Sequence, residues 1–234
     1  MENKDYRSHY QIDAELFNYF ENNKYDVDYN RRLHTCIRKL FSGRANKILD
    51  IGSGGGWSVE TLSEFGNIHL FDLSHKNLCA IKHKSETNAV VGDALFLPFK
   101  KDCFDYVIIS EVLEHINSPL NAIEQAFRVL KSGGKIIITT PYNEKIRYYL
   151  CVHCNKMTPA NAHLHSFTVE SMSQLLNKLK ISSVKYVKFG SKILTVTRIS
   201  YMLRFLPYCF WRLKDRLLNL MIDKPNTLIT IIRK

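Results

Sequence analysis

The chain of 234 residues lacks the features that would carry it into or across a membrane. No stretch of about 20 residues is free of both charge and proline, so no membrane-spanning helix is expected. The first residues carry charges throughout and contain no apolar signal core, so secretion is not expected either. The length suits one α/β domain, residues 1–234, which would bury roughly 70% of its unfolded surface. The sequence therefore predicts a single cytoplasmic domain.

The glycine-rich segment Lys47–Gly56 lacks two signatures of phosphate binding. Its apolar run ends in Asp50, and the glycines that follow let the backbone come close to a ligand. The third glycine of the dinucleotide fingerprint falls on Trp57, and the phosphate-binding lysine of a P-loop is missing. An acid at the end of the strand instead suits a ligand with a cationic amino group. S-adenosylmethionine (SAM) is such a ligand.

Two later acids stand at the distances that such a site needs. Asp72 ends a second apolar run 22 positions after Asp50, and its carboxylate can accept hydrogen bonds from both ribose hydroxyls. Asp93 follows the run that begins at Ala89 and can accept a hydrogen bond from the adenine amino group. A fourth apolar run, Phe104–Ser110, opens into the sequence E-x-x-E-H. These segments together predict a SAM site.

The ordered segments LDIGSGGG, FDLS, VGDALFLPF, FDYVIISEVLEHI and RVLKSGGKIIITTP resemble the class I SAM-dependent methyltransferases, in particular the type 11 and type 12 small-molecule enzymes. The resemblance runs from about Tyr25 to Tyr142 and resumes at the C-terminus. It implies that SAM lies with its methionine end at the first glycines and with its ribose and adenine at the second and third acids. The positions it implies for the cofactor are Tyr25, Asp50, Gly52, Ser53, Gly54, Asp72, Leu73, Asp93, Ala94 and Glu111.

Strand and helix patterns alternate along the chain, which predicts an α/β fold: a Rossmann-like, mostly parallel sheet with helices on both faces. The resemblance implies seven strands, with the last strand antiparallel beside the sixth. Residues 1–42 are predicted to form an N-terminal helical lid, and Gly133 to cap a helix over 119–131. Further helices are expected at 58–65, 75–84 and 168–180, and late strands at 135–140, 183–189 and 227–233.

A Cys/His-rich insertion is expected at residues 143–167. Cys151 and Cys154, followed by His163 and His165, offer four ligands to a tetrahedral Zn²⁺ ion. The insertion resembles one in methyltransferases from polysaccharide gene clusters, although this copy lacks the usual glycine after the second cysteine. The alternative is a pair of reduced cysteines with surface histidines.

The E-x-x-E-H sequence offers a different metal site. Glu111, Glu114 and His115 resemble the metal-binding run of the small-RNA 2′-O-methyltransferases and the ubiquinone O-methyltransferases. There a later histidine, here best matched by His163, joins carboxylates and a histidine around a divalent ion that holds neighbouring substrate oxygens. Oxygen-rich ligands of this kind suit Mg²⁺ or Mn²⁺. Many type 11 methyltransferases carry the same run without metal, and there it closes the floor of the active site.

A second insertion, residues 191–224, is basic and amphipathic. It holds seven Lys or Arg against two Asp, a net +5 of the chain's formal +11. Apolar residues at helical spacing, broken by Pro207, predict two amphipathic helices. This segment is a candidate for peripheral membrane contact through anionic headgroups, or for widening the pocket toward an acidic substrate. The alternative is an apolar stripe that packs on its own domain. The stripe comprises Ile199, Met202, Leu203, Leu206, Phe210, Leu213, Leu217 and Met221.

The predicted chemistry is methylation of oxygen on a small or lipid-linked acceptor. His115 is the expected base for a hydroxyl nucleophile, with His163 or His165 next, because imidazole titrates near neutral pH. Glu114 is expected to orient His115, and Tyr142 to line the acceptor pocket. Glycan precursors rank first as acceptors, then a quinone or prenylated phenol, methylated at oxygen or carbon. An RNA methyltransferase and a non-enzymatic SAM-fold protein that binds a partner remain the other classes.

Overall fold

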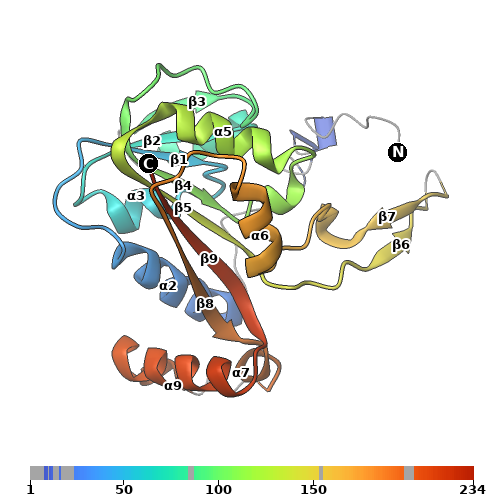
Figure 1. The fold of residues 1–234 in the computed structure, drawn as a ribbon. Coiled ribbons are helices and arrows are strands. Elements are labelled where there is room, and N and C mark those ends of the chain that lie inside the picture. Colours follow the sequence, from blue (N-terminus) through green and yellow to red (C-terminus); the bar gives the residue numbers. More distant parts are fainter. Residues whose placement is uncertain are drawn as a thin grey trace.

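A computed structural model describes residues 8–9, 11–12, 16, 24–83, 87–152, 155–197 and 203–234. A seven-stranded sheet with the order β3-β2-β1-β4-β5-β9-β8 forms its centre (Figure 1). Strands β1 to β5 run parallel, and β9 lies between β5 and β8 and runs antiparallel to both. The predicted fold class is therefore confirmed. The strands are β1 (Lys47–Ile51), β2 (Asn67–Asp72), β3 (Asn88–Val91), β4 (Phe104–Ser110), β5 (Leu130–Pro141), β8 (Ser183–Ser191) and β9 (Pro225–Arg233).

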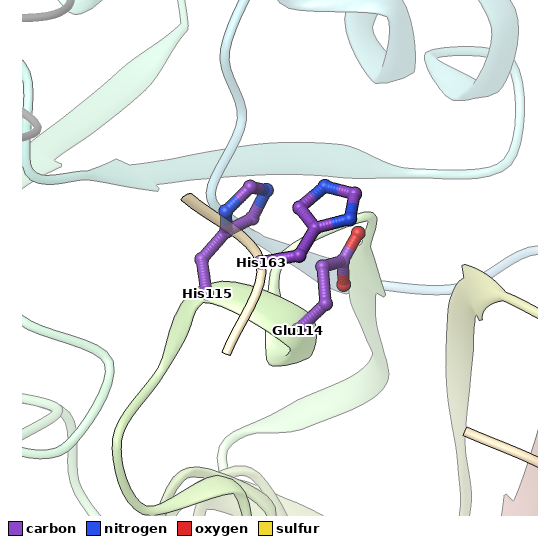
Figure 2. A group of neighbouring side chains, drawn as sticks. All are labelled: Glu114, His115 and His163. Carbon is purple, nitrogen blue, oxygen red and sulfur yellow. The ribbon is translucent and has the colours of Figure 1, made fainter. Parts of the chain in front are cut away.

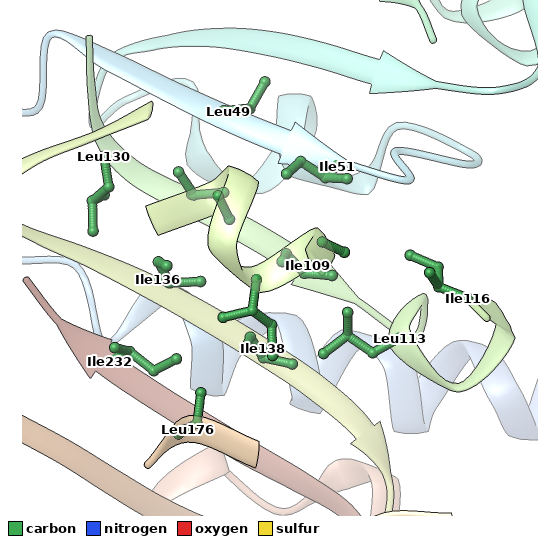
Figure 3. Packing of buried hydrophobic residues seen from close by; sticks show 14 of the residues in the cluster. Leu49, Ile51, Ile109, Leu113, Ile116, Leu130, Ile136, Ile138, Leu176 and Ile232 are labelled. Carbon is green, nitrogen blue, oxygen red and sulfur yellow. The ribbon is translucent and has the colours of Figure 1, made fainter. Parts of the chain in front are cut away.

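Helices cover both faces of the sheet. Helices α2 (Lys24–Arg38), α3 (Trp57–Leu62) and α4 (His75–Lys82) pack on one face. Helices α5 (Pro119–Val129) and α6 (Val169–Leu176) cover the other face, whose core is drawn in Figure 3. Successive side chains of a strand point to opposite faces, so Ile136 and Ile138 join the second core while Ile137 joins the first. This two-sided burial stabilises β5 by roughly 1.5–3 kcal/mol per isoleucine.

The segment around Gly133 differs from its prediction. Helix α5 ends at Val129 and β5 begins at Leu130, so Gly133 lies within a strand and is not a helix cap. The backbone N–H of Gly133 donates to the carbonyl of Lys234 at 3.0 Å, which joins this segment to the C-terminus of the described chain. The positive φ of 77° explains why a glycine stands there.

The two insertions contain short elements of their own, and the second packs against the main sheet through Trp211. Residues 143–167 form a hairpin of β6 (Tyr148–Leu150) and β7 (Met157–Pro159), followed by the short helix η2 (Ala160–Ala162). Residues 191–224 contain α7 (Lys192–Val196), η3 (Leu203–Phe205) and α9 (Tyr208–Met221). Of the stripe expected there, Ile199 and Met202 lie outside the described residues. No helix in the described ranges is long and apolar enough to cross a membrane.

The predicted N-terminal lid is described only in part. Its described helix, α2, contributes to the core, where Leu33 and Ile37 are buried. The ring of His34 stacks on Trp57 with 4.1 Å between centroids, which holds α2 against α3. The lid residues 1–7, 10, 13–15 and 17–23 are outside the described ranges.

Candidate functional site

A cavity of about 800 Å³, counting the space open to solvent, lies at the carboxyl ends of the parallel strands. Strand β1 pairs with β2 on one side and with β4 on the other, and ligands of open α/β sheets bind at such a switch in strand order. The lining consists of Ile51, Gly52, Gly54, Phe71, Asp72, Leu73, Asn77, Gly92, Asp93, Ala94, Glu111, Val112, His115 and Ile116.

The glycine turn after β1 forms one wall of this cavity. Gly52 has φ of 71°, and a Cβ there would lie 2.3 Å from the side chain of Val112. Gly54 has φ of 47°, and a Cβ there would meet nothing closer than a backbone oxygen at 4.0 Å. Both positions favour glycine through their positive φ, and Gly54 presents open space to a ligand.

Asp72 is fixed at the end of β2 with its carboxylate at the cavity. Its Oδ2 accepts a hydrogen bond from the backbone N–H of Gly54 at 2.8 Å, and its Oδ1 accepts one from Ser74 at 2.8 Å. Burial raises the pKa of this carboxyl, while the two N–H donors oppose that shift. Each carboxylate oxygen can accept more than one hydrogen bond, so Asp72 can bind ribose hydroxyls without moving. Asp93, whose Oδ1 accepts the N–H of Leu95 at 2.9 Å, lines the cavity farther along.

Two of the expected cofactor residues lie behind the turn. Asp50 is fully buried and accepts a hydrogen bond from the hydroxyl of Ser58 at 2.5 Å. Ser53 is buried as well. Neither belongs to the cavity lining, so their contact with the cofactor stays a prediction, and in this structure they lie beside the turn. The side chain of Tyr25 lies outside the described residues. The expected residues that do line the cavity are Gly52, Gly54, Asp72, Leu73, Asp93, Ala94 and Glu111.

The buried carboxyl of Asp50 gives a prediction on stability. Burial raises its pKa to about 7, against about 3.9 for an unfolded aspartate. The folded chain then binds the proton more tightly, so stability falls as pH rises from about 4 to about 7. We expect the melting temperature of Asp50→Asn, in thermal unfolding without ligand, to fall less between pH 5 and pH 8 than that of the wild type. Glu124→Gln, at an exposed position on α5, is the control and should follow the wild type. Equal slopes for Asp50→Asn and the wild type would contradict the prediction.

A second group of polar residues gathers beside the cavity. Glu114 and His115 belong to the short helix η1 (Leu113–His115), and His163 comes from the segment after η2. One potential metal-ligating atom from each of the three lies within 4.8 Å of the others, and Figure 2 shows the side chains converging. The carbonyl of Glu114 accepts hydrogen bonds from the N–H groups of Leu164 at 2.7 Å and His165 at 3.2 Å. These bonds hold His163 against η1.

The electrostatics of this group favour a cation. Burial raises the pKa of Glu111 to about 7, with Glu144 adding to the shift. Burial and the neighbouring Glu111 raise the pKa of Glu114 well above its usual range. The Oε2 atom of Glu114 is buried and has no hydrogen-bond partner among the described residues. A positive charge placed between these acids would favour their ionised forms.

Glu111 also has an uncommon backbone conformation. Its φ is 53°, and a positive φ at a non-glycine residue is sparsely populated. Such conformations cluster at functional sites, where the surrounding structure holds them. The backbone N–H of Glu111 donates to the carbonyl of Thr139 at 3.0 Å, which fixes the turn that carries the side chain into the cavity lining.

A second cavity lies beside the β6–β7 hairpin. Its walls include Glu144 and the basic residues Lys145, Arg147 and Lys192. Glu144 forms a hydrogen bond with Nδ1 of His163 at 2.5 Å. The ring of His163 meets that of His115 edge to face, with 4.7 Å between centroids. His115 lines the first cavity, so a continuous row of side chains links the two cavities.

Two expected site residues, Tyr142 and Cys151, lie elsewhere than predicted. Tyr142 is buried and lines neither cavity; its carbonyl accepts a hydrogen bond from Nζ of Lys192 at 2.8 Å, which positions that lysine at the second cavity. Cys151 lines the second cavity and is not in the group with His163. The described residues therefore do not assemble the expected zinc set, and Cys154 lies outside them.

Several residues at the site were not predicted from the sequence. Phe71, Asn77, Gly92, Val112 and Ile116 line the first cavity without belonging to the expected set. Phe71 could have been predicted, because it directly precedes Asp72. Glu144 belongs to no recognisable motif, since its role depends on meeting a histidine 19 positions later.

Part of the chain is similar to known methyltransferases. Residues 49–138 match the family model described as "Methyltransferase domain". The mitochondrial ubiquinone biosynthesis O-methyltransferase of Rattus norvegicus is 32% identical over 114 residues, covering 44% of this chain and 33% of the rat protein. The chain thus spans about a third of that relative's length.

Solved structures agree in fold. A SAM-dependent methyltransferase from Archaeoglobus fulgidus has a TM-score of 0.63 at 19% identity, covering 97% of this chain and all 100% of that one. Phosphoethanolamine N-methyltransferase 2 of Haemonchus contortus, solved with SAM, has a TM-score of 0.58 at 20% identity, covering 88% of this chain and 52% of that one. At these sequence identities, the structural similarity shows a shared fold and nothing more.

Proposed function

We propose that this chain, whose residues 49–138 match the model of a methyltransferase domain, is a SAM-dependent methyltransferase that methylates a hydroxyl oxygen of a small or lipid-linked acceptor. The row His115–His163–Glu144 carries this proposal. It provides acid–base groups between a cavity suited to the cofactor and a cavity suited to an acceptor.

The first cavity fits SAM by the chemistry of its lining. Asp72 offers carboxylate oxygens to the ribose hydroxyls, and Asp93 offers one to the adenine amino group. Glu111 lines this cavity, and a cationic ligand beside it would stabilise its carboxylate. When bound, SAM supplies an electrophilic methyl group on a positively charged sulfur.

The residues of this chain then have to orient the acceptor and take up its proton. His115 is the proposed base, because it lines the cofactor cavity and belongs to the row that reaches the second cavity. Glu144 accepts a hydrogen bond from His163 when Nδ1 carries its proton, which would hold that ring in place. Little further acid–base chemistry is required, since alignment and exclusion of water supply most of the acceleration in such transfers.

A divalent ion bound by this group is the alternative to His115 as the base, because an imidazole that ligates a metal has no lone pair left to accept a proton. Glu114, His115 and His163 offer one carboxylate and two imidazoles, a set that binds Zn²⁺, Mn²⁺ or Mg²⁺ depending on added oxygen ligands. The partnerless Oε2 of Glu114 among the described residues supports this fit. The ligand atoms, up to 4.8 Å apart, would draw together slightly, because ligands at about 2.1 Å from one ion lie within about 4.2 Å of each other. When bound, the ion would lower the pKa of an acceptor hydroxyl.

Two acceptor classes are supported by different observations. A phenol with a neighbouring oxygen, as in a catechol, suits the three-ligand group and agrees with the similarity to the ubiquinone biosynthesis O-methyltransferase of rat. A glycan or other lipid-linked precursor that carries an anionic group suits the basic walls of the second cavity, where Lys145, Arg147 and Lys192 lie. We propose the phenolic class first.

Transfer of labelled methyl groups tests the proposal. Protein purified without a metal-affinity tag is analysed for bound metal by mass spectrometry and for SAM binding by calorimetry. It is then assayed with a catechol and with the matching monophenol, with and without Mg²⁺, Mn²⁺ or Zn²⁺. We expect SAM binding, transfer to the catechol, and loss of that transfer in Glu114→Gln with SAM binding retained. No SAM binding would overturn the methyltransferase reading. Metal-independent transfer to both phenols would contradict a role for the divalent ion. One zinc ion per chain that is lost in Cys151→Ser/Cys154→Ser would favour the glycan class of acceptor.

A further inference from the structure

Helix α9 is attached to the domain through a buried face that combines Trp211 with three polar side chains. Asp215 accepts hydrogen bonds from the backbone N–H of Gly190 at 3.2 Å and from Nδ2 of Asn219 at 3.1 Å, and it forms an ion pair with Arg212. Arg212 also donates to the carbonyl of Lys188 at 3.0 Å. Asp215, Arg212 and Asn219 are all buried. Turning the helix over would separate these buried charges, so the contacts with β8 fix its orientation.

The opposite face of α9 is apolar and exposed. The exposed fractions are 60% for Phe210, 57% for Leu213, 52% for Leu217, 83% for Leu220 and 81% for Met221. At 3.6 residues per turn these side chains form one stripe roughly 100° wide, directly opposite the buried face. We call it the α9 stripe. Single exposed apolar residues are ordinary, but a contiguous stripe marks an interaction surface.

Positive charge borders the α9 stripe on both sides. By helical spacing, Lys214 lies along one edge of the stripe and Arg216 along the other, and both are exposed. Asp215 is the acid of this helix, and it is buried against Arg212. Asp223, just beyond the helix, pairs with Lys188 at 2.6 Å. The surface around the stripe therefore offers an apolar band with cationic edges.

We propose that the α9 stripe docks this protein onto an anionic lipid bilayer. The apolar side chains would enter the boundary between headgroups and acyl chains, with Lys214 and Arg216 against lipid phosphates, as their long stems permit. Charge complementarity selects this occupant, because the chain as a whole carries a formal +11 and repels a second copy. Figure 1 shows α9 at the edge of the molecule beside β8, where a flat surface can reach it. Docking is independent of the proposed methyl transfer.

Flotation with lipid vesicles tests this proposal on the full chain. We expect the protein to float with phosphatidylcholine vesicles that contain phosphatidylglycerol, to float weakly with phosphatidylcholine alone, and to be released by salt. Leu217→Glu/Leu220→Glu should abolish flotation. Lys214→Glu/Arg216→Glu should weaken partitioning about 30-fold or more, from roughly 1 kcal/mol per basic residue near the surface.

Matched variants separate docking from general charge. Lys178→Glu/Lys180→Glu makes the same charge change at exposed positions after α6, and it should float like the wild type. All substituted residues are exposed, so unfolding temperatures and SAM binding should stay unchanged. Flotation that survives Leu217→Glu/Leu220→Glu, or that falls equally in Lys178→Glu/Lys180→Glu, would overturn the proposal. The proposal would also be overturned if the wild type bound no vesicles and light scattering showed a dimer that Leu217→Glu/Leu220→Glu abolishes.

Discussion

Asp72→Ala is expected to weaken SAM binding about 100-fold in calorimetry. The carboxylate lies at the cavity, and hydrogen bonds from two ribose hydroxyls to a charged acceptor contribute roughly 1.5–3 kcal/mol each. In the wild type, the two carboxylate oxygens of Asp72 accept hydrogen bonds from the backbone N–H groups of Gly54 and Ser74. The substitution removes both acceptors. The glycine turn and the start of α4 would lose their common anchor.

Two comparison variants make this loss specific. Asp93→Ala removes one proposed adenine contact and should cost about tenfold in affinity, since a single hydrogen bond is lost. Glu124→Ala, at an exposed position on α5, should bind SAM like the wild type. Thermal unfolding without ligand distinguishes an unfolded Asp72→Ala protein from one that is folded and cannot bind. Full affinity in a folded Asp72→Ala protein would move the cofactor away from this cavity.

The sheet was predictable because its strands are buried on both faces. Strand β4 runs over Phe104–Ser110, the predicted range, and its side chains contribute to both cores. Continuous apolar runs of this length, separated by turns, leave few alternatives to a parallel sheet. The end of α5 was not predictable, since β5 extends back to Leu130 through pairing with Phe104, a long-range contact.

The acids after the strands show where local reasoning stops. Asp72 faces the cavity as expected, whereas Asp50 does not. Side chains alternate along β1, so Asp50 shares a face with Ile48, which packs in the core beneath α2 and α3. On that face it meets Ser58. Whether a side chain near the end of a strand faces the cavity or the core depends on its exact position in the strand. The sequence pattern leaves that position uncertain by one residue, and a shift of one residue exchanges the two faces.

Helix α9 buries Trp211 and exposes most of its other large apolar side chains. The spacing correctly predicted a helix with an apolar stripe, but Leu213, Leu217 and Met221 of that stripe are exposed. The buried face is set by Asp215 and its partner Gly190, which lies 25 positions earlier on β8. An ion pair and its backbone donors satisfy one another only once the chain is folded, so no local pattern reports them.

His115→Ala is expected to lower the turnover rate by about 100- to 10,000-fold, the range for loss of a general acid–base group. His115 lines the cofactor cavity and meets His163 at 4.7 Å, so its imidazole is the group best placed between cofactor and acceptor. SAM affinity should change far less than in Asp72→Ala. The measurement is transfer of labelled methyl groups to a catechol under saturating SAM, across pH.

The pH profile distinguishes a base from a merely structural histidine. Without the imidazole, deprotonation of the acceptor depends on hydroxide, so the rate of His115→Ala should keep rising at pH values where the wild-type rate has levelled off. A structural defect would lower the rate equally at every pH. The turnover rate of His163→Ala should lie between those of the wild type and His115→Ala, because this substitution removes the ring that contacts His115 and leaves the base itself. His83→Ala, at an exposed position after α4, controls for the loss of an imidazole elsewhere. Full turnover in His115→Ala at neutral pH would assign proton removal to another group, with Glu111 and the acceptor's own ionisation as the remaining routes.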